Sequence, residues 1–145
     1  MVYPAVIDTI GDVGSVVGSI ATTRLALGML SSSFKSIMKN TPEIVGGWLS
    51  SAVWFILFSL ISFYSTHRAI VFQEWLSLLS VLLTLNILAA PIMAVISYGV
   101  AVLTYRKGLN PDNFVIPIES SLSDSITTIS LFVALSLFGG VGKTT

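Results

Sequence analysis

Carboxylate side chains lie inside segments of this chain that are otherwise apolar. Asp8 and Asp12 stand near the start of the sequence, and Glu119 and Asp124 stand near its end. An ionisable side chain in a bilayer is costly, so such residues normally face a bundle interior or a water-filled path. Carboxylates, hydroxyls and carbonyls are hard oxygen ligands, which suit Mg²⁺ or Ca²⁺. These residue types therefore predict a site for a divalent cation, with Mg²⁺ favoured and Mn²⁺ or other divalent ions as alternatives.

The carboxylates belong to polar stripes, because positions three and four apart share one face of an α-helix. The first stripe consists of Asp8, Asp12, Ser15, Ser19 and Thr22, and the second consists of Ser120, Ser121, Asp124, Thr127 and Thr128. Glu119 is about 140° round the helix from Asp124, so we expect it at a mouth of the path rather than in the stripe. The candidate metal ligands are Asp124, Ser120, Asp12, Asp8, Ser121 and Glu119. A proton relay, or carboxyl groups kept neutral, is the alternative interpretation of the stripes.

Other chemistries have few residues to support them. The chain has no cysteine and a single histidine, His67, which leaves no thiolate or imidazole cluster for zinc. No pair of a nucleophile and a base is recognisable, so we expect no enzyme activity. The tail at 139–145 is similar to the end of a phosphate-binding loop, but its glycine spacing is wrong and it follows a span. We interpret it as a plain tail.

The composition of the chain indicates which class of protein fold holds these residues in position. Of 145 residues, 54% are hydrophobic and 10% charged, the net charge is zero and the mean hydropathy is +0.91. Low hydrophobicity and high charge define disordered chains, so that class is excluded. Without a basic excess the chain has nothing to neutralise phosphates, which argues against nucleic-acid binding. There are too few charges to cover a soluble globule. We therefore expect a multi-pass protein of the cell membrane, in contact with lipid.

Four segments are long enough to span, at about 20 apolar residues each. They are residues 3–30, 43–66, 74–105 and 114–138. The sequence thus predicts an all-α transmembrane bundle of about four spans in one domain, 1–145, with a glycine-rich first helix and a polar-striped last helix. More Lys and Arg residues lie in the first and third joints than on the opposite side, where Arg68 and Lys143 stand, which favours cytoplasmic first and third joints.

Several single residues carry further expectations. The second segment, with Trp54 and Tyr64, suits a lipid-facing support helix. Pro91 removes one helical hydrogen bond and favours a kink. Asn86 bonds to another helix or, alternatively, lines a pore. Arg24 is near a helix end, so we expect it to reach the interface by snorkelling rather than to pair with a carboxylate.

The first segment is rich in small residues. Gly14 and Gly18 have the spacing that lets helix backbones approach closely. Glycines also permit a break that would expose carbonyls to a cavity, and both interpretations stay open. Two polar stripes are too few to enclose a hydrated ion, so we expect a homodimer or pairing with a related half. An assembly or accessory subunit, whose stripes only bind helices together, is the alternative function.

Two motifs resemble those of the MgtE membrane domain. The first is Tyr3-Pro4-Ala5-Val6-Ile7, then Gly11-Asp12-Val13-Gly14, then Ala21-Thr22-Thr23-Arg24-Leu25. The second runs from Asn110 through Pro111-Asp112-Asn113, Pro117 and Ser120-Ser121 to Asp124. The form is most similar to the archaeal and animal solute-carrier branch of MgtE-like magnesium transporters. The resemblance covers roughly the first 25 residues and residues 110–128.

The resemblance implies a channel or transporter that conducts mainly Mg²⁺ through a pore between two copies of the domain. It places the pore aspartate at Asp124 and a backbone carbonyl ligand at Ser120. The family's asparagine falls on Asp12, a departure that adds a carboxylate per copy. Family members usually have one further span before the first motif, which leaves a short natural half, a truncated chain or one part of a larger assembly as alternatives.

Overall fold

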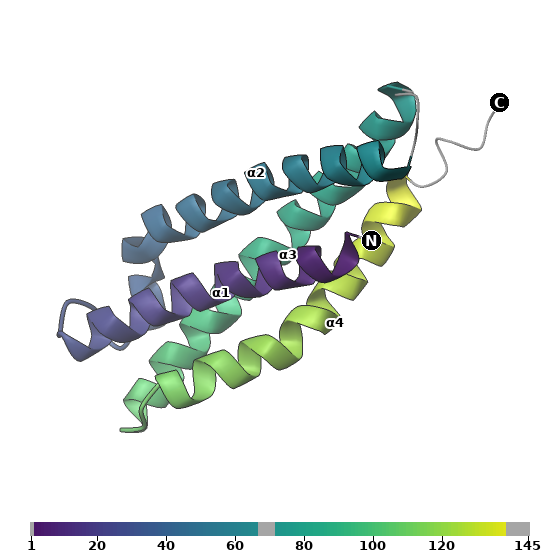
Figure 1. Cartoon of the computed structure of the whole chain (residues 1–145). Helices are drawn as coiled ribbons and strands as arrows, with labels where there is room; N and C mark the ends of the chain where they lie inside the picture. The colour runs from purple at the N-terminus through teal and green to yellow at the C-terminus, as the bar shows by residue number, and fades with distance from the viewer. Residues whose placement is uncertain (1, 67–71, 139–145) are drawn as a thin grey trace.

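In the computed structural model, which describes residues 2–66 and 72–138, four long helices form an all-α bundle (Figure 1). They are α1 (Tyr3–Ala26), α2 (Thr41–Thr66), α3 (Phe72–Arg106) and α4 (Asp112–Phe138), with a short 3₁₀ helix, η1 (Phe34–Asn40), before α2. Each long helix is long and apolar enough to cross a membrane. The predicted bundle of about four spans is therefore confirmed, and the chain is a multi-pass membrane protein.

Glycines in the left-handed conformation end two of these helices. Gly28 has φ +69° and follows α1, which ends at Ala26 rather than at Leu30 as the hydropathy pattern predicts. The amide of Gly28 donates to the Leu25 carbonyl (3.1 Å), which closes the last turn. Gly108 has φ +71° just beyond α3. Glycine adopts this backbone without the steric cost that a Cβ would bring, so both helices stop at these positions.

Successive helices run in opposite directions, so α1 and α4 lie antiparallel and side by side (Figure 1). The Tyr3 hydroxyl, at the start of α1, bonds to the Thr128 hydroxyl on α4. Helix α3 packs against each of the other three helices. It has 35 residues, about 52 Å at 1.5 Å per residue, and continues through Pro91 as one helix. The core therefore forms around α3, and α1 and α4 meet in front of it.

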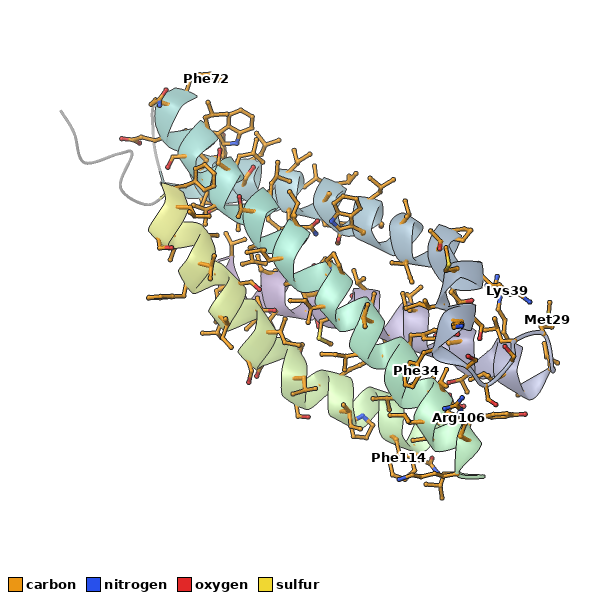
Figure 2. All side chains as sticks on the ribbon, turned by 180° about the vertical axis from the view of Figure 1, so that it is seen from behind. Met29, Phe34, Lys39, Phe72, Arg106 and Phe114 are labelled. Atoms are coloured by element: carbon orange, nitrogen blue, oxygen red, sulfur yellow. The ribbon has the colours of Figure 1, made fainter. Side chains whose placement is uncertain are left out.

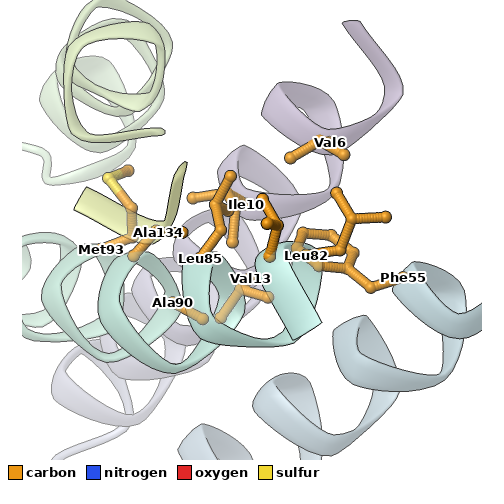
Figure 3. Close-up of a cluster of buried hydrophobic side chains, with 11 residues drawn as sticks. Val6, Ile10, Val13, Phe55, Leu82, Leu85, Ala90, Met93 and Ala134 are labelled. Atoms are coloured by element: carbon orange, nitrogen blue, oxygen red, sulfur yellow. The ribbon is translucent and has the colours of Figure 1, made fainter. Parts of the chain in front are cut away.

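A layer of buried hydrophobic side chains fills the centre of the bundle (Figure 3). Val6, Ile10 and Val13 of α1 meet Leu85 and Met93 of α3 in this layer. Between helices in lipid, close van der Waals packing supplies the attraction, and small residues let the backbones approach. Because the apolar face of α1 is used here, its opposite face, which carries the aspartates, points out of the bundle.

Helix α2 contributes one inner face and one exposed face. Trp54 and Tyr64 are exposed, as expected of a helix that supports the bundle from its lipid side. On the inner face, the buried Asn86 amide of α3 donates to the Ser51 hydroxyl (2.6 Å). Of the two alternatives for Asn86, the bond to another helix is confirmed, since both partners are buried between α2 and α3.

The first and third joints lie at the same end of the bundle. Figure 2 shows Lys39 and Arg106 together at one end and Phe72 at the other. Arg106 donates to the Ser32 carbonyl and sits over the Phe34 ring, 5.9 Å from its centroid. The basic residues of the first joint, Lys35 and Lys39, and those of the third joint, Arg106 and Lys107, thus share one end. The remaining residues of that argument, Arg68 and Lys143, lie outside the described residues, as do His67 and the tail at 139–145.

Candidate cation-binding groove

A polar groove of about 470 Å³ lies between α1 and α4. It is lined by Pro4, Ile7, Asp8, Gly11, Asp12, Ser15, Ile116, Glu119, Ser120, Ser123 and Asp124. The structure therefore brings five of the six candidate ligands to one place, from opposite ends of the sequence. Four of the lining residues are carboxylates, which gives the groove a strongly acidic character when they are ionised.

The α1 wall of the groove is built by helical spacing. Asp8 and Asp12 are one turn apart and exposed, and Ser15 follows on the same side. Like charges one turn apart repel each other, so a cation between them is favoured. The predicted stripe is longer than the wall: Ser19 donates to the Ser15 carbonyl (2.7 Å) beyond the groove, and Thr22 is buried elsewhere.

The α4 wall carries Asp124 and Ser120, both exposed to the groove. Ser123, which the sequence argument does not select, also lines it and donates to the Ser120 carbonyl (3.3 Å). The Asp124 carbonyl accepts from the Thr128 hydroxyl (2.5 Å), and Thr128 also bonds to Tyr3. These bonds connect the α4 wall to the start of α1 and hold Asp124 at the groove.

Ser121 does not line this groove. Its hydroxyl bonds within its own helix, to the carbonyls of Pro117 and Ile118 (3.0 Å each). With 100° per residue, Ser121 lies on one side of Asp124, whereas Ser120 and Ser123 lie on the other. The second polar stripe is therefore wider than the wall that α4 gives to the groove, and only one edge of it faces α1.

Glu119 differs from the expectation that it stands at a mouth. Its side chain is only 3% exposed and reaches across to α1, where a Cβ added at Gly14 or Gly18 would come within 3.2 Å or 3.1 Å of its Oε1. The expectation is wrong because the two glycines leave room for the carboxyl inside the bundle. Glu119 forms part of the floor of the groove.

The close approach of α1 to its neighbours depends on the same glycines. A Cβ at Gly18 would be 2.5 Å from Val115 Cγ1, and one at Gly14 would be 2.8 Å from Ser97 Oγ. Real Cβ atoms do not tolerate such distances, so these positions require glycine in this packing. Helix α1 is unbroken from Tyr3 to Ala26, which favours the packing interpretation of the glycines over a helix break.

Within the described ranges, no three acidic or histidine side chains are close enough to hold a metal ion as a cluster. The groove therefore does not form an all-carboxylate cage. Magnesium dehydrates reluctantly and commonly keeps several waters while one or two carboxylates bind it. A wide groove with separate carboxylates and hydroxyls fits a hydrated ion of this kind.

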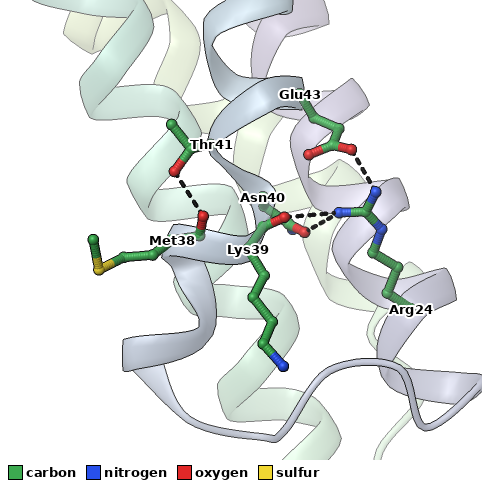
Figure 4. Close-up of polar contacts among 6 residues, drawn as sticks. All are labelled: Arg24, Met38, Lys39, Asn40, Thr41 and Glu43. Carbon is green, nitrogen blue, oxygen red and sulfur yellow. Dashed lines mark hydrogen bonds and ion pairs between the residues drawn. The ribbon is translucent and has the colours of Figure 1, made fainter.

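Arg24 forms the second charged region of the bundle (Figure 4). It pairs with Glu43 of α2, and its Nη1 donates to Asn40 Oδ1 (2.6 Å) and to the Lys39 carbonyl (3.2 Å). The prediction that Arg24 snorkels instead of pairing is wrong, because η1 folds back and places Asn40 and Glu43 beside the end of α1. Three acceptors placed around one side chain suit the planar guanidinium, whose N–H donors are held in a fixed fork.

Residues 3–134 of the chain match the family described as "MgtE: Divalent cation transporter". The match extends from the start of α1 to the last part of α4, so it includes both walls of the groove. Comparison with curated proteins and with solved structures gave no significant match.

Proposed function

Because the chain belongs to the MgtE family of divalent cation transporters, we propose that the α1–α4 groove is its half of the ion path and that the ion is Mg²⁺. The observation that carries this proposal is the position of the acidic residues. Asp8, Asp12 and Asp124 face out of one copy, along a groove within apolar helices. A transporter of this family moves divalent cations, and carboxylates that face a groove supply the oxygen ligands these ions prefer.

A second copy, or a related half, completes the path. An ionised residue at the bilayer centre costs about 2.5–3.5 kcal/mol on insertion scales when it meets lipid. Three exposed aspartates along one groove would make lipid contact there expensive. Facing grooves of two chains related by a two-fold axis would remove that contact and enclose water. We therefore propose a homodimer whose path runs between α1 and α4 of both copies.

Within this path each ligand has a distinct role. Asp124 binds the ion or its inner waters, and Ser120 offers the backbone carbonyl that points along α4. Asp8 and Asp12, one turn apart, attract the cation toward the groove, since a cleft lined by one sign of charge raises the local concentration of counter-ions. Glu119 stands at the floor. Ser121, which bonds to its own helix, contributes only after a change of rotamer.

The test is divalent uptake by proteoliposomes, with Mn²⁺ as the reporter ion. We expect Asp124→Asn to lower uptake sharply, because it removes the charge while keeping the size. Glu74→Gln is the matched control: it also replaces a carboxylate by an amide of the same size, at an exposed position in the first turn of α3 and outside both the groove and the two motifs. The control should transport as the wild type does, and both variants should remain dimeric.

Two results would contradict the proposal. Uptake by Asp124→Asn equal to that of the Glu74→Gln control would remove Asp124 from the path. Loss of dimers in Asp124→Asn, together with loss of uptake, would favour the assembly or accessory role, in which the polar stripes only hold helices together. Dimerisation is measured by cross-linking in native-like lipid before reconstitution.

A further inference from the structure

Two buried oxygen atoms without hydrogen-bond partners lie close to each other where α3 and α4 pack against α1, and one of them belongs to a residue that lines the groove. Glu119 Oε1 is one of them, and the side chain is 3% exposed. Ser97 Oγ, from α3, is the other, and its side chain is fully buried. Native proteins give at least 90% of buried polar groups a partner, so two such atoms in one place need an explanation.

Both oxygens face the same strip of α1. A Cβ added at Gly14 would lie 2.8 Å from Ser97 Oγ and 3.2 Å from Glu119 Oε1. A Cβ at Gly18 would lie 3.1 Å from the same carboxyl oxygen. The hydroxyls of Ser15 and Ser97 stand beside the carboxyl, but neither satisfies Oε1 with ordinary hydrogen-bond geometry. Helices α3 and α4 thus bring two unpartnered oxygen atoms against the same glycine backbone of α1, where any larger residue would collide with them.

We infer that Glu119 and Ser97 form an inner site for the transported divalent cation, where the ion exchanges part of its water shell for these two side chains. This inference rests on the proposed function. The ion would enter from the groove, which Glu119 itself lines, and keep its remaining waters on that side. Ser97 would then be a specificity-determining residue contributed by α3, which the two sequence motifs do not include.

A cation explains this arrangement better than packing does. An ionised carboxyl inside an apolar bundle needs a positive partner or a full set of donors. The nearest basic side chain along α1, Arg24, is already bound to Glu43, Asn40 and Lys39. The remaining charge of a divalent ion would be balanced by the other carboxylates of the groove, Asp12 and Asp124 among them. Hydroxyl and carboxylate oxygens are ligands that Mg²⁺ and Mn²⁺ accept.

The test uses Mn²⁺ as the probe and the full chain in detergent or nanodiscs. Electron paramagnetic resonance gives Mn²⁺ affinity from the free-ion signal, and the ¹⁷O-water signal counts the waters on the bound ion. We expect Ser97→Ala and Glu119→Gln to weaken binding roughly tenfold or more, as for loss of a contact to a charged partner. In both variants the bound ion should carry one more water.

The matched control is Thr104→Val. Thr104 lies two turns after Ser97 on α3, and its hydroxyl bonds only to backbone carbonyls of its own helix, those of Val100 (2.7 Å) and Ala101 (3.2 Å). Its loss should change neither Mn²⁺ affinity nor the water count. A melting curve for each variant confirms that the bundle is folded before binding is compared.

The failures of this inference and of the proposed function can be told apart. Wild-type Mn²⁺ affinity and water count in both Ser97→Ala and Glu119→Gln, with uptake still lost in Asp124→Asn, would overturn the inner site and leave the groove as the path. Unchanged uptake in Asp124→Asn would overturn the proposed path and the inner site with it. Weaker binding with an added water, in both Ser97→Ala and Glu119→Gln and not in the control, supports the inference.

Discussion

Two regions of the bundle hold charged side chains within apolar helices: the α1–α4 groove and the corner formed by Arg24, Asn40 and Glu43. In the corner, the cation and anion come from the same chain and bind each other. In the groove, all of the ionisable lining residues are carboxylates, and Glu119 has a buried oxygen with no partner. The charges of the corner are balanced within one copy, whereas the carboxylates of the groove require a positive partner. The net charge of a region, rather than its polarity, therefore separates a structural contact from a candidate ion site.

Magnesium should stabilise the protein through the groove and not through the corner. A ligand present at a hundred times its dissociation constant adds about 2.7 kcal/mol to the free energy of unfolding. We expect the wild type to gain close to this amount on adding Mg²⁺ at constant ionic strength, and Asp124→Asn to lose most of the gain. Glu43→Gln should keep the gain while starting from a lower stability. Denaturant unfolding in detergent measures the stability of all three proteins. A full gain in Asp124→Asn would show that Mg²⁺ does not bind through Asp124.

A substitution at Gly18 of α1 should change the free energy of unfolding nearly as much as ion binding in the groove does. Gly18→Ala places a Cβ 2.5 Å from Val115 Cγ1, so overpacking should destabilise the bundle by about 1–3 kcal/mol. Gly46→Ala is the control, because nothing lies within 4 Å of a Cβ there, and removing a helical glycine should add roughly 0.5–1 kcal/mol. Thermal unfolding of both variants measures the difference. Equal stabilities would mean that α1 does not approach α4 as closely as described.

The corner should give the smallest effect. Arg24 and Glu43 are 29% and 19% exposed, so solvent screens their attraction. A double-mutant cycle with Arg24→Ala and Glu43→Gln should give a coupling of roughly 0.5–1 kcal/mol in the free energy of unfolding. Arg24→Lys should recover only part of it, because an ammonium cannot serve three acceptors in the fixed fork of a guanidinium. A lysine variant as stable as the wild type would contradict this geometry.

The sequence predicts the helices well, because hydropathy and length decide what can span a membrane. The walls of the groove were also predictable, since Asp8, Asp12, Ser120 and Asp124 follow helical spacing. The hydropathy pattern places the end of the first span at residue 30, whereas α1 ends at Ala26. The difference arises because hydropathy continues past Gly28, whose left-handed backbone stops the helix. Hydropathy carries no information about such a backbone turn.

Contacts between distant segments could not be predicted in the same way. The pairing of Arg24 with Glu43 depends on the path of η1, which places residues 19 positions apart side by side. Ser97 comes close to Glu119 only because α3 packs against α1, and no residue three or four positions from Ser97 in the sequence is polar. Periodicity alone also does not say on which side of Asp124 the neighbour lies, so it selects Ser121 and omits Ser123.

The most direct test of the central claim is an anomalous-scattering map of crystals of the chain grown in lipid with Mn²⁺. We expect a manganese peak inside the α1–α4 groove, beside Asp124 and facing the groove of a second copy. We also expect no manganese at the paired corner of Arg24 and Glu43. The contrary result would be a map in which manganese occupies other sites but not the groove, and in which the groove packs directly against lipid.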